Sequence, residues 1–172
     1  MSYQDMPDVT PGPDSVVIDV RAAGVCFPDL LLSKGEYQLK LPPPFIPGME
    51  VAGVVSSAPD GSGFAVGQRV CASVLGGYAE QVSAPVANVK PSPAELDDAE
   101  AVSLLVNYHT MYFAFERRAA LRPGETVLVL GAAGGIGVAA IQVAQAMGAR
   151  VIAVVHRSAA MEFVSSLGPD AV

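Results

Sequence analysis

The stretch VLVLGAAGGIGVAAIQVAQ, Val127 to Gln145, decides how the second half of the chain folds. Its apolar beginning predicts a buried strand over residues 126–130, and its later part predicts a helix over about 135–147. A strand that runs through glycines into a helix directs backbone N–H groups and the positive end of the helix dipole at a phosphate. The stretch therefore predicts a dinucleotide-binding turn made by Gly131, Gly134, Gly135, Ile136 and Gly137.

The residues that follow continue an alternation of strand and helix. A second strand is expected over 151–155 and a second helix over about 159–167, and DAV at 170–172 is expected to begin a further strand. Such alternation is typical of a doubly wound parallel sheet. The alternative for the glycines is a turn with a structural role only.

The end of the second expected strand bears on the choice of cofactor. A site that prefers NAD usually has a carboxylate there, which accepts a hydrogen bond from the ribose 2′-hydroxyl. This chain has His156, Arg157 and Ser158 instead. A guanidinium and a hydroxyl suit a 2′-phosphate, so the sequence favours NADPH. The alternative is that Arg157 is a solvated loop residue.

The first hundred residues are expected to be rich in strands. SVVIDVRAAGV, FIPGMEVAGVVSSA and GQRVCASV have the apolar patterns of strands, and turn-forming stretches such as TPGPD and APDGSG separate them. This pattern favours a small barrel-like β domain. A helical period begins at Ser92 or Pro93, so we expect one domain over 1–95 and a second over 96–172.

Composition excludes several classes of protein. The 172 residues are 51% hydrophobic with a formal charge of −7, which argues against disorder and against nucleic acid or an anionic membrane as a partner. No basic-then-apolar segment resembles a signal peptide, so a cytoplasmic protein with reduced cysteines is expected. Two cysteines and two histidines in separate elements predict no metal site made of protein ligands alone.

Several motifs occur in the order of a known family. TPGPDSVVIDVRAAGVCFPDLLLSKGEYQ, PFIPGMEVAGVV, GGYAE, LLVNYHTMYFAF and RPGETVLVLGAAGGIGVAAIQVAQAMGARVIAVV together closely resemble the medium-chain dehydrogenase/reductase superfamily. The branch they resemble is that of the zinc-independent, zeta-crystallin-like quinone oxidoreductases. The resemblance implies an α/β protein with a GroES-like β-rich catalytic domain over 1–95 and an incomplete Rossmann domain over 96–172.

The resemblance also bears on zinc. Zinc-dependent members place Cys, His and Cys at three positions, which are Cys26, Met49 and Val106 here. One thiol cannot form a catalytic zinc site with a thioether and an alkyl group. Cys26 is therefore expected to be a packed or cleft-lining thiol rather than a nucleophile.

The activity that the resemblance implies is hydride transfer from NADPH to a quinone or a similar conjugated carbonyl, without metal. Tyr37 is the candidate for substrate binding or proton donation, with an ordinary half-buried loop tyrosine as the alternative. Asn107 and Thr110 match positions near the nicotinamide, or they have structural hydrogen bonds within their helix. Asp29 lies near the same cleft by resemblance, or it caps a helix.

The chain departs from the family in two respects. Many relatives carry a lysine where Ala160 stands, which makes Arg157 the remaining candidate for the 2′-phosphate. The chain is also about half the family's length, so we expect a truncated product with exposed apolar sheet surface and poor stability without a partner.

Two other functions stay open beside the quinone oxidoreductase. An enoyl or enoyl-thioester reductase uses the same scaffold, and a non-catalytic remnant would bind nucleotide at most. The full-length form is a possible homo-oligomer.

Overall fold

The structure is a computed structural model that describes residues 2–172. The chain divides into two compact units, which are described separately: an N-terminal unit that extends through Leu105 and a C-terminal unit, Val106–Val172. The N-terminal unit is built on an antiparallel sheet and the C-terminal unit on a parallel one.

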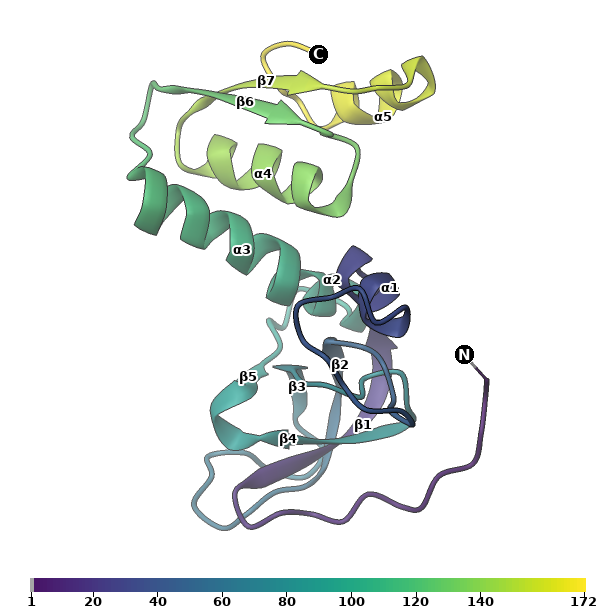
Figure 1. The fold of residues 1–172 in the computed structure, drawn as a ribbon. Coiled ribbons are helices and arrows are strands. Elements are labelled where there is room, and N and C mark those ends of the chain that lie inside the picture. The colour runs from purple at the N-terminus through teal and green to yellow at the C-terminus, as the bar shows by residue number, and fades with distance from the viewer. Residues whose placement is uncertain (1) are drawn as a thin grey trace. The chain divides into compact units, whose positions relative to one another are not determined.

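The sheet of the N-terminal unit has five strands in the order β4-β1-β2-β3-β5 (Figure 1). They are β1 (Ser15–Ala23), β2 (Glu50–Ser57), β3 (Arg69–Ser73), β4 (Gln81–Pro85) and β5 (Val89–Pro91), with a short 3₁₀ turn, η1 (Val86–Asn88), before the last. The first three confirm the strands predicted from the sequence. Each pair is antiparallel, as expected for a GroES-like fold.

Side chains alternate between the two faces along these strands, and apolar residues lie on both faces of the sheet. One face forms a core from every second residue: Val16, Ile18, Val51, Val55, Val70, Ala72, Val82, Ala84 and Val89. On the other face, Ala52 and Cys71 pack against Val102 of helix α2 (Asp98–Ser103). The period of two thus lets one sheet contribute to two apolar clusters.

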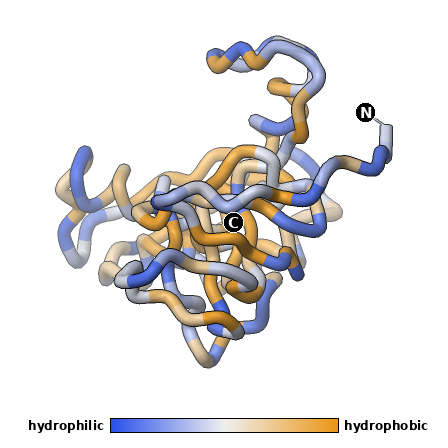
Figure 2. Tube along the Cα trace, turned by 90° about the horizontal axis from the view of Figure 1, so that it is seen from below, coloured by the Kyte–Doolittle hydropathy of each residue, from blue (hydrophilic) through white to orange (hydrophobic). Residues whose placement is uncertain are grey.

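The β1–β2 pair is irregular at one place. Its register shifts between Val20 and Ala22, and a Cβ on Gly53 would lie 2.0 Å from the Asp19 carbonyl oxygen. Only a glycine permits this approach of the two backbones. Helix α1 (Phe27–Ser33) follows β1, and the segment before β1, at the N label of Figure 2, is largely hydrophilic.

The long helical region begins later than predicted. A start at Ser92 or Pro93 is wrong, because the Leu96 N–H donates to the Pro93 carbonyl in a turn, and α2 begins at Asp98. Asp97 caps the helix: its carboxylate accepts from the Glu100 N–H at 2.8 Å, and Glu100 accepts from the Asp97 N–H at 3.0 Å. This reciprocal pair satisfies two N–H groups and fixes the start of the helix.

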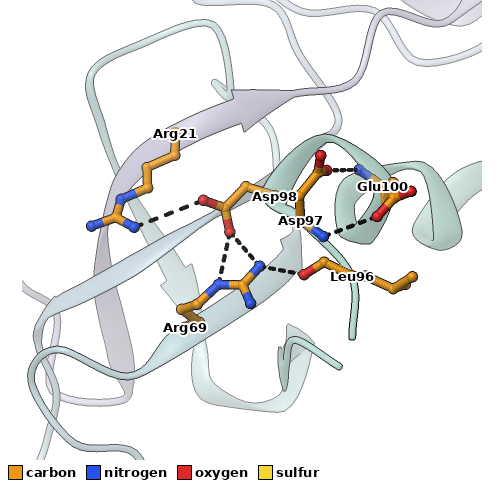
Figure 3. A network of polar contacts seen from close by, with 6 residues as sticks. All are labelled: Arg21, Arg69, Leu96, Asp97, Asp98 and Glu100. Carbon is orange, nitrogen blue, oxygen red and sulfur yellow. Dashed lines mark hydrogen bonds and ion pairs between the residues drawn. The ribbon is translucent and has the colours of Figure 1, made fainter. Parts of the chain in front are cut away.

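An arginine anchors the first turn of α2 to the sheet. The Arg69 guanidinium on β3 donates two hydrogen bonds to Asp98 Oδ1, at 2.9 and 3.1 Å, and one to the Leu96 carbonyl at 2.7 Å (Figure 3). Arg21 on β1 approaches the other oxygen of Asp98 at 3.8 Å. Two strands are thereby tied to one helix start.

Helical structure then continues to Ala119 with two π-helical stretches. These are η2 (Leu104–Tyr108) and η3 (Phe113–Ala119), on either side of the short α3 (His109–Tyr112). Ala120 ends the region with a left-handed conformation, φ 50°.

The C-terminal unit has the predicted order of strands and helices. It contains β6 (Thr126–Leu130), α4 (Gly135–Ala146), β7 (Arg150–Val154), the 3₁₀ turn η4 (Ser158–Ala160) and α5 (Met161–Ser166). β6 has the predicted bounds, whereas β7 begins and ends one residue earlier than predicted. The two strands are parallel, and Ile152 forms one isolated parallel bridge to Ala171, where the sequence led us to expect the beginning of a further strand.

The core of this unit lies on the α4 side of the strands. It contains Phe115, Val129, Ala132, Ala140, Ile141, Ala144, Ala149, Val151, Ala153 and Val164. The arrangement is the first part of a Rossmann domain.

Over residues 2–172, the structure contains no helix with the length and apolar character that crossing a membrane requires.

Candidate functional site

The predicted glycine turn forms where β6 ends. Gly131 leaves the strand with φ +69°, which is a left-handed conformation that favours glycine. Its carbonyl accepts from the Gly134 N–H at 3.0 Å. The Ala132 N–H donates to the carbonyl of Val154 at 3.1 Å, so the turn is tied to the end of β7.

The glycines of the turn differ in the space around them. A Cβ on Gly137 would lie 2.5 Å from the Gly131 carbonyl oxygen and 2.7 Å from the Ala132 backbone, so this glycine lets the helix pack on the turn. A Cβ on Gly134 would be 3.5 Å from its nearest neighbour, which is ordinary contact. The backbone at Gly134 is exposed, so a ligand can approach it closely.

The first turn of α4 offers unpaired donors. Within residues 2–172, no acceptor contacts the backbone N–H groups of Gly135, Ile136 and Gly137. These groups lie at the positive end of a helix of 12 residues. The donors and the open backbone at Gly134 fit a phosphate or pyrophosphate group.

Asn107 is the predicted residue that lies against this turn. A Cβ on Gly135 would come within 2.8 Å of the Asn107 Nδ2 atom, so the amide packs against the start of α4. The adjacent Tyr108 hydroxyl donates to Gln142 Oε1 on the same helix. Thr110, by contrast, is exposed.

His156, Arg157 and Ser158 follow β7 and are all exposed. Their backbone begins η4, where the Arg157 carbonyl accepts from the Ala160 N–H at 3.0 Å. In the part of the chain that the structure describes, the Arg157 guanidinium has no ion-pair partner. It is therefore free to bind an anion.

The N-terminal unit holds a polar cluster in which Asp29 and Glu50 are buried and Cys26 and Tyr78 are partly buried. Glu50 and Asp29 are 1% and 3% exposed. The Cys26 thiol donates to Glu50 Oε1 at 3.1 Å, and the Cys26 N–H donates to Asp29 Oδ2 at 2.8 Å. Asp29 thus caps α1 from its third position, and the residue at the N-cap is Cys26.

Burial and the carboxyl groups of Glu50 and Asp29 raise the pKa values of the Cys26 thiol and the Tyr78 hydroxyl. Burial, the hydrogen bond to Glu50 and the nearby acidic groups raise the pKa of Cys26 to about 12. Burial and the neighbouring Asp29 likewise raise the pKa of Tyr78. Cys26 is therefore a neutral thiol near pH 7, which agrees with a packed thiol and not with a nucleophile.

The cluster does not fit zinc. Over residues 2–172, no group of three His, Cys, Asp or Glu side chains is arranged to hold a metal ion. Asp29 Oδ1 and Tyr78 Oη are buried without a hydrogen-bond partner within 3.5 Å, so the cluster keeps two unsatisfied polar atoms.

Sequence reasoning did not identify Glu50 and Tyr78 as members of this cluster. The available signal for Glu50 was a carboxylate within the otherwise apolar run of FIPGMEVAGVV. A Cβ on Gly24 would lie 2.1 Å from Glu50 Oε1, so that glycine makes room for the carboxylate.

Tyr37 lies in a bend after α1 and is half-buried. Its N–H donates to the Leu31 carbonyl at 3.2 Å. A cavity of about 690 Å³ in the same unit is lined by residues 2–9, 33, 43–47 and 78–81, and Tyr37 is not among them. Its role in substrate binding or proton donation stays a prediction.

Comparison with known proteins agrees with both halves of this description. Residues 12–94 match the alcohol dehydrogenase GroES-like domain. A probable oxidoreductase from Mycobacterium abscessus is 64% identical and superposes on 99% of the chain with a TM-score of 0.96. The chain belongs to the medium-chain dehydrogenase/reductase superfamily. A quinone oxidoreductase of Thermus thermophilus, solved also with NADPH, is 42% identical over 98% of the chain with a TM-score of 0.87.

The chain spans about half the length of these superfamily members. It covers 55% of the Mycobacterium abscessus protein and 54% of the Thermus thermophilus protein. The quinone oxidoreductase of Rattus norvegicus is 41% identical over 149 residues, which are 84% of this chain and 45% of that protein.

Proposed function

We propose that the C-terminal unit holds the adenosine and pyrophosphate part of NADPH. We also propose that the chain is the N-terminal part of a zinc-free oxidoreductase that transfers hydride to a quinone or a similar conjugated carbonyl. The observation that carries the proposal is the turn Gly131–Gly137 with its unpaired N–H groups at the start of α4. An NADPH complex of the Thermus thermophilus relative supports the choice of cofactor.

Each residue of the proposed site has a distinct task. The N–H groups of Gly135, Ile136 and Gly137 bind the pyrophosphate, and Gly134 lets it approach. Arg157 binds the 2′-phosphate, with His156 and Ser158 beside it. Asn107 holds the start of α4 through its contact with Gly135, and we place Thr110 on the nicotinamide side.

The reaction needs little further from the protein. When bound, NADPH supplies the hydride; with one proton it reduces a quinone to a hydroquinone and leaves NADP⁺. A conjugated acceptor is electron-poor, so the chain's tasks are to orient it and to supply the proton, for which Tyr37 is the candidate. The neutral Cys26 takes no part in bond formation.

Titration of the purified chain with NADPH and with NADH, followed by nicotinamide fluorescence, tests the cofactor. We expect saturable binding that is stronger for NADPH. Arg157→Ala should weaken NADPH binding about tenfold, the worth of one charge-assisted contact, and leave NADH binding unchanged. Equal losses for both cofactors would assign Arg157 no contact with the 2′-phosphate.

Two glycines of the same turn provide a matched pair. Gly134→Ala should weaken nucleotide binding without lowering the free energy of unfolding, because its Cβ has room until the phosphate arrives. Gly137→Ala should lower the free energy of unfolding by about 1–3 kcal/mol, because its Cβ would overlap the backbone of the turn. If Gly134→Ala bound NADPH as tightly as the parent chain, the site would lie elsewhere.

The substrate is tested by turnover assays with NADPH on the protein that carries this sequence. Turnover with a quinone supports the proposal, whereas turnover only with an enoyl-thioester assigns the enoyl reductase. Nucleotide binding without turnover of either would indicate a non-catalytic protein. Tyr37→Phe should lower kcat if Tyr37 donates the proton.

A further inference from the structure

Two neighbouring residues of η2 contact helix α4 at two different places. The Asn107 amide lies against Gly135, the first residue of α4, where a Cβ would come within 2.8 Å of its Nδ2 atom. The Tyr108 hydroxyl donates to Oε1 of Gln142. Gln142 comes seven residues after Gly135, so the two contacts are about 10 Å apart along the axis of α4. All four residues belong to the C-terminal unit.

The spacing of the two contacts restrains how α4 is oriented. A contact at the start of the helix restrains that end alone, whereas a second contact two turns later restrains the direction of its axis. Residues seven apart lie on the same face of an α-helix, so the two contacts together also oppose rotation of α4 about that axis. The residues that make them come from η2, and π-helical turns of this kind are rare and occur frequently at functional sites.

Apolar packing does not provide the same restraint. Buried residues of α4, among them Ala140 and Ile141, pack in the core of this unit, but the burial of apolar surface is non-directional. Over the described residues 2–172, the side chain of Asn107 forms no hydrogen bond, so it contacts α4 by packing alone. The hydrogen bond from Tyr108 to Gln142 is therefore the directional contact that η2 makes with α4.

The start of α4 carries the groups that need this restraint. The backbone N–H groups of Gly135, Ile136 and Gly137 have no acceptor within residues 2–172. Several donors bind one anion together only when each lies within about 0.5 Å of its productive position. A small change in the direction or rotation of α4 would therefore weaken the binding of a pyrophosphate while leaving the fold intact.

We propose that Tyr108 and Gln142 are positioning residues for the nucleotide site, which hold the start of α4 where its N–H groups converge on the pyrophosphate. The part that concerns the nucleotide rests on the proposed function, whereas the restraint on α4 does not. Because the pair is exposed, its loss should change the stability of the fold little. Its effect should appear in the placement of the donors.

The chain offers matched variants for a test. Tyr108→Phe removes only the hydroxyl, Gln142→Met removes the acceptor at a similar length, and Gln142→Glu keeps an acceptor and should restore the contact. Tyr112→Phe is the control. Tyr112 lies on α3, which runs alongside α4 (Figure 1), its side chain is 54% exposed, and its hydroxyl forms no hydrogen bond within residues 2–172.

Two measurements separate the nucleotide from the helix. Nicotinamide fluorescence gives NADPH binding at about 0.15 M salt, where the charge added by Gln142→Glu is largely screened. Hydrogen exchange without nucleotide reports on the start of α4 through the Val138 amide, which donates to the Gly134 carbonyl at 2.8 Å.

We expect Tyr108→Phe and Gln142→Met each to weaken NADPH binding about fivefold and to accelerate exchange of the Val138 amide about as much, which is the effect of one hydrogen bond. The double variant should lose no more than either single variant, because the two residues form one contact. Gln142→Glu and Tyr112→Phe should behave as the parent chain does. The midpoint of urea unfolding should change little in every variant.

The outcomes separate this inference from the proposed function. Unchanged exchange of Val138 in both single variants, or losses that add in the double variant, would overturn the inference whether the chain binds NADPH or not. If the parent chain binds NADPH and Tyr108→Phe binds it equally well, the inference is also overturned. If the parent chain binds no NADPH, and both single variants accelerate Val138 exchange as much as the double variant, the pair positions α4 and the proposed cofactor site is wrong.

Discussion

The two units differ in how fully the apolar side chains of their sheets are buried. In the N-terminal unit, Val51 and Ala52 are neighbours on β2 that point to opposite faces, and both are 0% exposed. In the C-terminal unit, Val129 is 6% exposed and its neighbour Leu130 is 73% exposed. A curled antiparallel sheet with one helix encloses both its faces, whereas a parallel sheet with helices on one side leaves the other uncovered.

The difference predicts where apolar side chains stabilise the isolated chain. Ile18→Ala should lower the free energy of unfolding by about 3 kcal/mol, because the side chain is completely buried in the core of the N-terminal unit. Leu130→Ala should change it by less than about 0.5 kcal/mol, because its side chain already contacts mainly solvent. Urea unfolding of both variants beside the parent chain measures the two values.

The Leu130 result also tests whether this exposed side chain is covered by another copy of the chain in solution. A cost above about 1 kcal/mol in the chain alone would mean that another copy covers Leu130 in solution.

The titratable groups of the two units also differ in their exposure to solvent. Cys26 and Glu50 lie together in the N-terminal unit, whereas Arg157 and His156 are exposed in the C-terminal unit. The pKa of Cys26 rises from about 9 to about 12 on folding, so the neutral thiol contributes stability below pH 9 that is lost between pH 9 and pH 12. At pH 8, alkylation of Cys26 should be about 50-fold slower in the folded chain than in urea.

Peptide mapping by mass spectrometry measures Cys26 and Cys71 separately, so no cysteine variant is needed. Glu50→Gln replaces a carboxyl group that raises the pKa of the Cys26 thiol, and it should accelerate alkylation of Cys26 in the folded chain. Equal rates for Cys26 in folded and unfolded chain would contradict the enclosed cluster.

Local pattern was sufficient to predict most of the C-terminal unit. The bounds of β6 and the start of α4 follow from apolar residues that end at a glycine with positive φ, which is a local signal. The predicted start of this helix, at Ser92 or Pro93, was wrong because Pro93 and the acidic residues after it resemble a first helical turn. The true cap, Asp97, is decided by its reciprocal bonds with Glu100.

The polar cluster around Cys26 and Glu50 could not be predicted from the sequence, because it depends on contacts between residues that are far apart in the chain. Cys26 and Glu50 are 24 positions apart, and a Cβ on Gly24 would overlap the Glu50 carboxylate that accepts from the thiol. The interpretation of Cys26 as a packed thiol followed from the lack of an activating histidine, but its partner came from the structure. Nothing local marks Asn107 as a neighbour of Gly135 either.

The smallest predicted difference is in the stability that two ion pairs contribute, one from each unit. The Arg69–Asp98 pair combines two hydrogen bonds with a third to Leu96, and the Asp98 side chain is 19% exposed. The Arg150–Asp170 pair is 3.8 Å long, with side chains 66% and 44% exposed. Arg69→Ala should cost about 1.5 kcal/mol of unfolding free energy and Arg150→Ala less than about 0.5 kcal/mol, since exposed pairs are screened and poorly ordered.

Salt separates screening from hydrogen bonding in this pair of variants. The cost of Arg69→Ala should persist at about 1 M salt, because the hydrogen bonds to Leu96 and Asp98 are partly buried, and Arg69→Lys should recover only part of it, because an ammonium lacks the planar fork. Urea unfolding at low and high salt checks both expectations. A cost that vanished at high salt would make the Arg69 contact a screened surface pair, and the start of α2 would then depend on its cap at Asp97 alone.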